Sequence, residues 1–202
     1  MRPIERSEIL SIGEYEGIRA RFRERVIAEK RPRRIKLGDD ISAIFENRDS
    51  VMLQIQEMLR IERITSEAGI KHEIETYNEL LPGPGELSFT LFVEIPDKER
   101  RDRMLIELKG LEQCVSLEVD GLLVPAKASP KGVMPDRTTA VQYFKLKLPE
   151  AAEGAIRAKT AKLAMRIDHP KYDVRVELGG ETLAKIAEDL AESDKDPRPG
   201  AD

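Results

Sequence analysis

Apolar residues in the first part of the chain recur every three to four positions, a period that predicts an amphipathic helix. The stripe consists of Tyr15, Ile18, Phe22 and Val26. Ser11 and Glu14 have the spacing of an N-terminal capping box. Pro32 has no N–H and restricts the residue before it. We therefore expect a helix from about Ile12 to Lys30.

A second helical region follows, and its apolar residues spread around most of a helical wheel. We expect a helix over 51–67 with Ser50 as its cap, and a break at Gly69 before a further helix over 70–81. The sequence PGPG directly after Leu81 ends that helix. The first of the two helices is predicted to be mostly buried.

From Glu86 onward the apolar period changes to two, which is typical of half-buried strands. Leu87, Phe89 and Leu91 would face the core, with Ser88 and Thr90 on the polar side. Further strands are expected at 115–119, 122–125, 139–148, 163–168 and 172–178, with a short hairpin at 34–46. Helices are expected at 97–109, 149–162 and 183–190, and a loop at 128–137.

This irregular order of helices and tightly connected strands predicts an α+β fold, with a mainly antiparallel sheet and several packed helices. We expect a single domain over 1–191, with a helical half at about 7–81 and a strand-rich half at about 86–191. Residues 192–202 are polar and form a predicted disordered acidic tail.

Composition narrows the class of protein. No apolar run approaches the roughly 20 residues of a membrane span, and the N-terminal sequence MRPIERSEIL is too polar for a secretory signal. Cys114 is the only cysteine, so an intrachain disulfide is impossible. We expect a cytoplasmic protein.

Charge is distributed unevenly along the chain. The net charge is −4, yet the segment from Arg19 to Lys36 holds nine basic and two acidic residues. A basic segment on an acidic body favours docking against an anionic partner, and Arg31, Arg33, Arg34 and Lys36 form the expected basic patch. Nucleic acid is one possible partner, although no aromatic residues interleave for base stacking. A solvated helix end is the alternative.

Several polar residues fall on apolar helical faces. Glu62 lies within the main apolar face of the helix at 51–67, and Glu57 lies between Leu53 and Ile64. The proposed cluster consists of Gln54, Glu57, Glu62, Glu73 and Asn78. Such oxygen ligands suit Mg²⁺ or Mn²⁺ better than zinc, or they perform acid–base chemistry. The alternative is an ion pair with an arginine of the basic first helix.

Familiar catalytic and cofactor motifs are missing from the sequence. There is no GxxxxGK[ST] phosphate loop and no GxGxxG at a strand-to-helix turn. Neither His72 nor His169 follows a glutamate by three residues, so the Glu-x-x-His pairs of a di-iron bundle are absent. These observations leave the cofactor unknown and the question of catalysis open.

Four long stretches carry a family resemblance: FENRDSVMLQIQEMLRIERI at 45–64, HEIETYNELLPGPGELSFTLFVEIPD at 72–97, AVQYFKLKL at 140–148 and RIDHPKYDV at 166–174. They resemble the bacterial family known as domain of unknown function 3501, from about Ser7 to Leu190. The resemblance implies no catalytic residues. It implies a redox or peroxide-stress context, with a rubrerythrin-like protein and an iron–sulfur oxidoreductase encoded nearby.

The leading hypothesis is a non-catalytic accessory or binding protein that docks on such redox partners through the basic patch. The first alternative is a metal-binding protein or enzyme that uses the buried carboxylates Glu57 and Glu62. The second alternative is nucleic-acid binding through residues 19–36.

Overall fold

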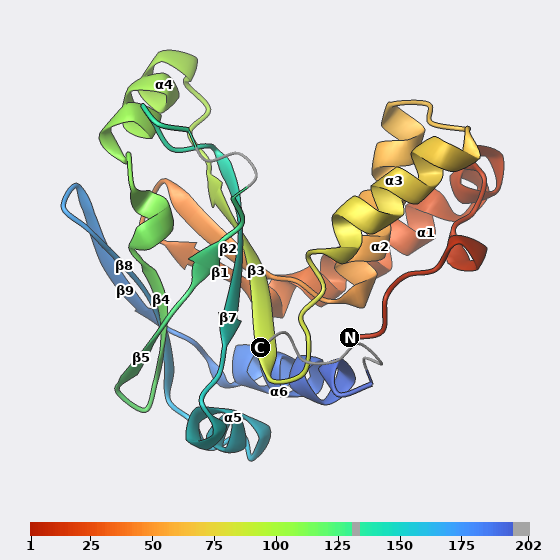
Figure 1. Ribbon diagram of the computed structural model, residues 1–202. Helices are drawn as coiled ribbons and strands as arrows, with labels where there is room; N and C mark the ends of the chain where they lie inside the picture. The colour runs from red at the N-terminus through yellow and green to blue at the C-terminus, as the bar shows by residue number, and fades with distance from the viewer. Residues whose placement is uncertain (131–133, 196–202) are drawn as a thin grey trace.

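The computed structural model describes residues 1–130 and 134–195, in which two antiparallel sheets are surrounded by six helices (Figure 1). The helices are α1 (Ile12–Lys30), α2 (Arg48–Ile61), α3 (Glu67–Asn78), α4 (Lys98–Glu107), α5 (Glu150–Arg157) and α6 (Gly180–Ser193). The strands are β1 (Arg34–Leu37), β2 (Ile41–Phe45), β3 (Glu86–Val93), β4 (Val115–Val119), β5 (Leu122–Pro125), β6 (Lys127–Ala128), β7 (Val141–Lys147), β8 (Leu163–His169) and β9 (Tyr172–Glu177).

One sheet has the strand order β1-β2-β3-β7-β6 and the other β5-β4-β8-β9. Every neighbouring pair of strands in both sheets is antiparallel. The predicted α+β class is therefore confirmed. The strands form two sheets rather than one, because β3 pairs with β2 and β7 while β4 pairs with β5 and β8.

The main core lies between the two sheets, with residues of α4, α5 and α6 closing its ends. A row of aromatic rings crosses the five-stranded sheet on its core side. Phe45 meets Phe89 edge-on at 5.7 Å between ring centroids, and Phe89 stacks on Phe144 at 5.0 Å. Such ring pairs add stability beyond the apolar area that they bury.

The opposite face of the five-stranded sheet is also covered, which the alternation along β3 did not predict. Ser88 and Thr90 are only 3% and 2% exposed. The segment after α3 lies against them, and the Ser88 hydroxyl donates to the carbonyl oxygen of Leu80 at 2.6 Å. This side of the sheet is therefore a polar interior surface.

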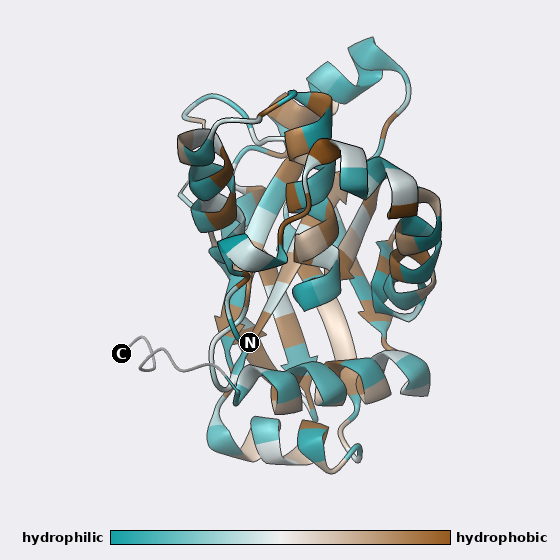
Figure 2. Cartoon of the chain, turned by 90° about the vertical axis from the view of Figure 1, so that its right-hand side faces the viewer, coloured by the Kyte–Doolittle hydropathy of each residue, from teal (hydrophilic) through white to brown (hydrophobic). Residues whose placement is uncertain are grey.

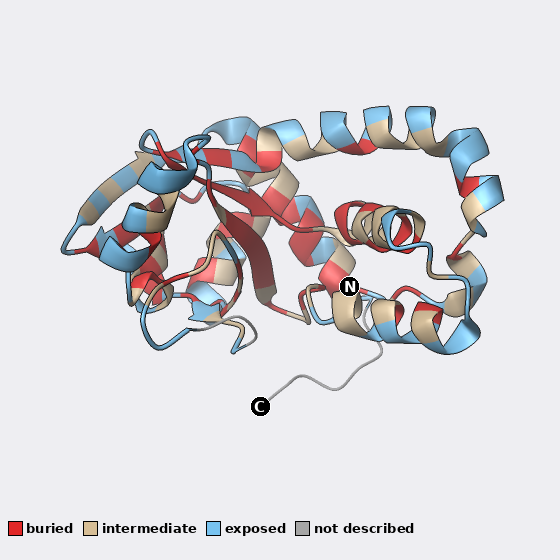
Figure 3. Cartoon of the chain, turned by 90° about the horizontal axis from the view of Figure 1, so that it is seen from above, coloured by how far each residue is buried: buried red, intermediate tan, exposed pale blue. Residues whose placement is uncertain are grey.

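Helices α1, α2 and α3 pack side by side on that side of the molecule (Figure 1). Their small apolar cores are separate from the core between the sheets. The predicted capping box of α1 is confirmed, since Ser11 and Glu14 bond each other's backbone N–H. Much of α1 is exposed, whereas the strands are mostly buried (Figure 3).

Helices α5 and α6 pack on each other below the sheets, and polar and apolar residues alternate along both (Figure 2). Helix α5 ends at Arg157, earlier than expected, because Lys159 adopts a left-handed φ of 58°. Helix α6 continues to Ser193, whose side chain is fully buried. The predicted tail boundary at 192 is therefore wrong, and most of that tail, 196–202, lies outside the described residues.

Candidate functional site

The carboxylate cluster expected on α2 does not form. Helix α2 starts at Arg48 with Asn47, not Ser50, as its cap, and ends at Ile61. Glu62 is the C-terminal cap and Arg63 takes a left-handed φ of 53°. The prediction that Glu62 is buried was wrong, because it assumed a helix that continues to residue 67. The helix ends before Glu62, and the Glu62 side chain is exposed.

Glu57 instead faces α1, where it meets arginines. Arg19 donates from Nε to Oε1 at 2.8 Å and from Nη2 to Oε2 at 3.0 Å. Arg23 adds a bond of 3.1 Å and the Tyr15 hydroxyl one of 2.7 Å. The Arg19 guanidinium and the Tyr15 hydroxyl hold the pKa of Glu57 at about 2, against the opposing effect of burial. This is the ion-pair alternative, and it fixes α1 on α2.

The other members of the expected cluster lie apart from one another. Asn78 bonds both the N–H and the C=O of Ile4 at 2.9 Å, so it fastens the N-terminal segment to α3. Gln54 donates to the Glu46 carboxylate at 3.2 Å. Glu73 is half-buried on α3. Among residues 1–130 and 134–195, no group of three or more His, Cys, Asp or Glu side chains is placed to hold a metal ion.

The expected basic patch is split between interior and surface. Arg33 is only 2% exposed, and its guanidinium forms a bidentate salt bridge with Asp189 of α6 at 2.8 and 3.0 Å. Arg34 is paired with Glu94. Arg31 and Lys36 are exposed. Sequence cannot separate these cases, because a partner 156 positions away decides the burial of Arg33.

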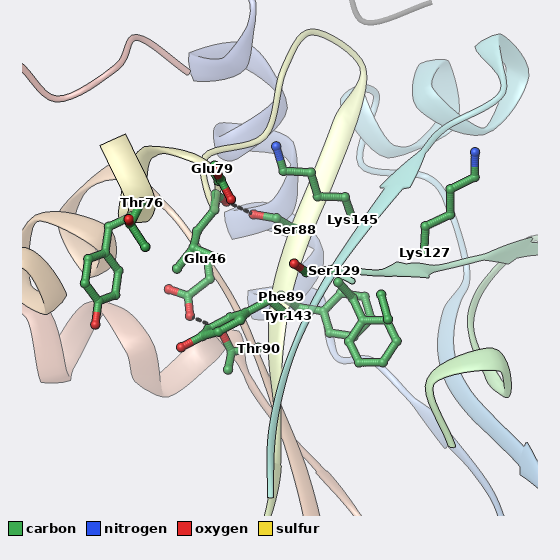
Figure 4. A pocket seen from close by; sticks show the side chains of 14 residues that line it. Glu46, Thr76, Glu79, Ser88, Phe89, Thr90, Lys127, Ser129, Tyr143 and Lys145 are labelled. Atoms are coloured by element: carbon green, nitrogen blue, oxygen red, sulfur yellow. Dashed lines mark hydrogen bonds between the residues drawn. The ribbon is translucent and has the colours of Figure 1, made fainter. Parts of the chain in front are cut away.

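A pocket of about 340 Å³ lies between the C-terminal end of α3 and the face of β3, β7 and β6 that carries Ser88 and Thr90 (Figure 4). We call it the Glu46 pocket. Its lining residues are Glu46, Thr76, Tyr77, Glu79, Leu80, Ser88, Phe89, Thr90, Lys127, Ala128, Ser129, Tyr143, Phe144 and Lys145. Its volume lies at the lower end of the range of ligand sites.

Glu46 is the most buried charged group of the pocket, with 3% of its surface exposed. Its Oε1 accepts a hydrogen bond from the Thr90 hydroxyl at 2.5 Å. Its Oε2 accepts from the Ser50 hydroxyl and from Gln54 Nε2. All three donors are neutral, so the carboxylate is solvated by the protein without a counter-charge.

Two tyrosines border the same space from opposite elements, Tyr77 on α3 and Tyr143 on β7. Burial raises the pKa of Tyr77 to about 12, with smaller contributions from Tyr143 and Glu73. Burial, together with the nearby charge of Glu46, also raises the pKa of Tyr143. Both phenols are therefore neutral hydrogen-bonding groups at physiological pH.

Lysines mark the other end of the pocket. Lys127 and Lys145 lie apart from Glu46, at the end of the pocket that also carries Glu79 (Figure 4). Lys145 is half-buried and donates to the Leu81 carbonyl oxygen at 2.9 Å, whereas Lys127 is exposed. The pocket thus has the Glu46 carboxylate at one end, and two lysines with Glu79 at the other.

Comparison with known proteins shows what the chain is related to. The profile of a family described as Protein of unknown function (DUF3501) matches residues 3–190. The chain belongs to the DUF3501 family. Of the solved structures, one similar to this DUF3501 chain is the crystal structure of a novel protein of unknown function from Burkholderia pseudomallei K96243. It has 31% sequence identity and a TM-score of 0.87, over 93% of this chain and 98% of that one. No curated protein matches.

Sequence patterns in this DUF3501 chain gave little sign of the Glu46 pocket. Glu46 lies in the two-residue connection between β2 and α2, where an acidic residue is ordinarily solvent-exposed. The one available signal was the alternation along β3, which places Ser88 and Thr90 on a common face. No helix in the described parts of this DUF3501 protein has the length and apolar character to span a bilayer.

Proposed function

We propose that this DUF3501 protein is a non-catalytic binding protein whose small organic ligand occupies the Glu46 pocket. The observation that carries the proposal is a buried, hydrogen-bonded carboxylate at the inner end of a mainly apolar pocket. A few polar groups that converge in an apolar pocket are the usual composition of a ligand site.

The chemistry of the lining residues supports binding over catalysis. No histidine or cysteine is among the described residues of the lining. Ser88, a hydroxyl on the sheet side, donates its proton to the Leu80 carbonyl oxygen rather than to a side-chain base that would activate it. Three donors hold the Glu46 carboxylate in one orientation, which suits recognition of a ligand group.

Occupancy of the pocket can be tested with a variant that fills it. Thr76 is half-buried on the α3 side of the pocket, and Glu75 is exposed on the same helix outside the lining. Native mass spectrometry of protein from its own host, purified without chelator, should show a bound small molecule in wild type and Glu75→Phe. Thr76→Phe should lose it. An identical mass adduct in Thr76→Phe, or none in wild type, would contradict the proposal.

A second role is supported by the basic residues that remain accessible between α1 and β1. Among the described residues, Lys30, Arg31 and Lys36 form no salt bridge, although most other basic residues of 19–36 do. Unpaired cations on a protein of negative net charge favour an acidic partner. We propose that this surface docks the protein, in the cytoplasm, on a rubrerythrin-like protein or an iron–sulfur oxidoreductase.

Charge reversal tests the docking role. Arg31→Glu and Lys36→Glu should weaken co-purification with either partner, and binding should fall as salt rises. Arg103→Glu, an exposed change on α4, is the matched control. A complex that survives high salt and both reversals would contradict docking through this surface. Steeply salt-dependent binding to DNA or RNA by the same residues would instead identify nucleic acid as the partner.

A further inference from the structure

The charge around Glu46 indicates which class of ligand the pocket takes. Thr90, Ser50 and Gln54 all donate hydrogen bonds to the carboxylate oxygens. Glu46 precedes the N-terminal cap of α2, where the helix dipole favours a negative charge. Among the described residues Glu46 forms no salt bridge. A buried negative charge thus borders the pocket without a cation beside it.

Aromatic rings stand beside this charge. Tyr77 and Tyr143 line the pocket from α3 and from β7, and Figure 4 shows the Tyr143 ring next to Glu46 and Thr90. The face of a tyrosine ring attracts a cation, and the attraction grows when water is excluded. A carboxylate together with two tyrosines therefore favours a positively charged group at the inner end of the pocket.

The outer end sets the orientation. Lys127 and Lys145 lie apart from Glu46, at the end of the pocket that also carries Glu79. Two lysines and one glutamate make that end less favourable for a cation than the Glu46 end, while Leu80 and the tyrosine rings offer apolar contacts between the two ends. A ligand with one ammonium group and one apolar body matches this gradient when the ammonium group is innermost.

We propose that the Glu46 pocket binds a small primary amine as its ammonium ion, with the ammonium group on Glu46 and the apolar body between Tyr77 and Tyr143. The inference rests on the proposed binding function and specifies its ligand class. The Glu46 oxygens supply the counter-charge, and Thr90, Ser50 and Gln54 keep them in position.

The experiment uses three probes that share one apolar body: 2-phenylethylamine, 2-phenylethanol and 3-phenylpropionate. Titration calorimetry and amide NMR shifts of the full chain should show the amine binding at least about tenfold more tightly than the other two. Glu46→Gln should remove that preference. Glu57→Gln removes a half-buried carboxylate from the α1–α2 contact and should retain the preference.

The outcomes separate the ligand class from the binding function. Tighter binding of the alcohol or the carboxylate at the same residues would overturn the amine assignment and leave the binding function standing. Failure of all three probes to bind would overturn both. If Glu46→Gln does not fold, Tyr143→Leu is used in its place. An amine affinity in Tyr143→Leu equal to that of wild type would overturn the proposed binding mode.

Discussion

Arg19 and Glu57 form a bidentate salt bridge that joins α1 to α2, with its two N···O distances at 2.8 and 3.0 Å. The Tyr15 hydroxyl, on the same side of α1, donates to the same carboxylate at 2.7 Å. Tyr15 is fully buried, whereas most of α1 is exposed. Polar contacts at Glu57 therefore have an unusually large part in positioning α1.

Removing this carboxylate should loosen α1. Glu57→Ala leaves Arg19, Arg23 and the buried Tyr15 hydroxyl without an acceptor, and we expect a loss of about 2–4 kcal/mol in the free energy of unfolding. Urea denaturation measures it. Glu62→Ala changes the exposed C-terminal cap of the same helix and should change the free energy of unfolding by less than about 0.5 kcal/mol. Equal losses of stability in the two variants would contradict the role of the Glu57 carboxylate in holding α1 on α2.

Stability should also fall in acid because of Glu57. Its pKa is about 2 in the folded protein, where Arg19 and Tyr15 stabilise the carboxylate, and 4.5 is its ordinary value. A lowered folded pKa contributes stability that is present above pH 4.5 and is lost as pH falls through 2. Wild type should lose up to about 3 kcal/mol more than Glu57→Gln over this window. Parallel pH profiles of unfolding would refute the prediction.

The buried pair of Arg33 and Asp189 should be intolerant of single changes. Arg33→Met leaves the Asp189 carboxylate, 6% exposed, without its counter-charge, and we expect a loss of about 3–5 kcal/mol. Arg31→Met, two residues earlier and exposed, is the control and should be nearly neutral. Thermal unfolding of both variants decides the matter. A stable Arg33→Met protein would show that the pair contributes little to the attachment of α6.

Gly38 should resist substitution for reasons of space and conformation. Its φ is 73°, and an added Cβ would lie 2.5 Å from the Tyr172 hydroxyl oxygen. That hydroxyl donates to the Leu37 carbonyl oxygen at 2.5 Å, so Gly38→Ala should disturb the contact between the two sheets. We expect a loss of more than about 1 kcal/mol, partly recovered in the Tyr172→Phe background.

Gly17→Ala gives the matched comparison, because Gly17 lies within α1 and an added Cβ would meet nothing within 4 Å. It should stabilise the protein by roughly 0.5–1 kcal/mol, since alanine is the better helix former. Chemical denaturation of both glycine variants measures the contrast. A destabilised Gly17→Ala protein would indicate an unrecognised contact on this face of α1.

Local patterns in the sequence determined the elements and the class of fold. The period of the apolar residues predicted α1, β3 and the hairpin of β1 and β2. The spacing of Ser11 and Glu14 predicted the capping box of α1. These features depend on residues within one or two turns of each other, so local physical rules suffice. The apolar period does not fix where a helix ends: α2 stops at Ile61, before a left-handed Arg63, and the longer predicted helix placed Glu62 in the cluster.

Tertiary structure decided the environments of Glu57, Arg33 and Glu46. Sequence predicted that Glu57 needed a partner, and the fold selected Arg19. The sequence pattern did not predict the contact of Arg33 with Asp189, nor the enclosure of Glu46 between α3 and the sheet. Both contacts join elements that are distant along the chain. Burial of a charge is a property of what packs over it. The periodic pattern therefore determined the elements, and only their assembly created the pocket.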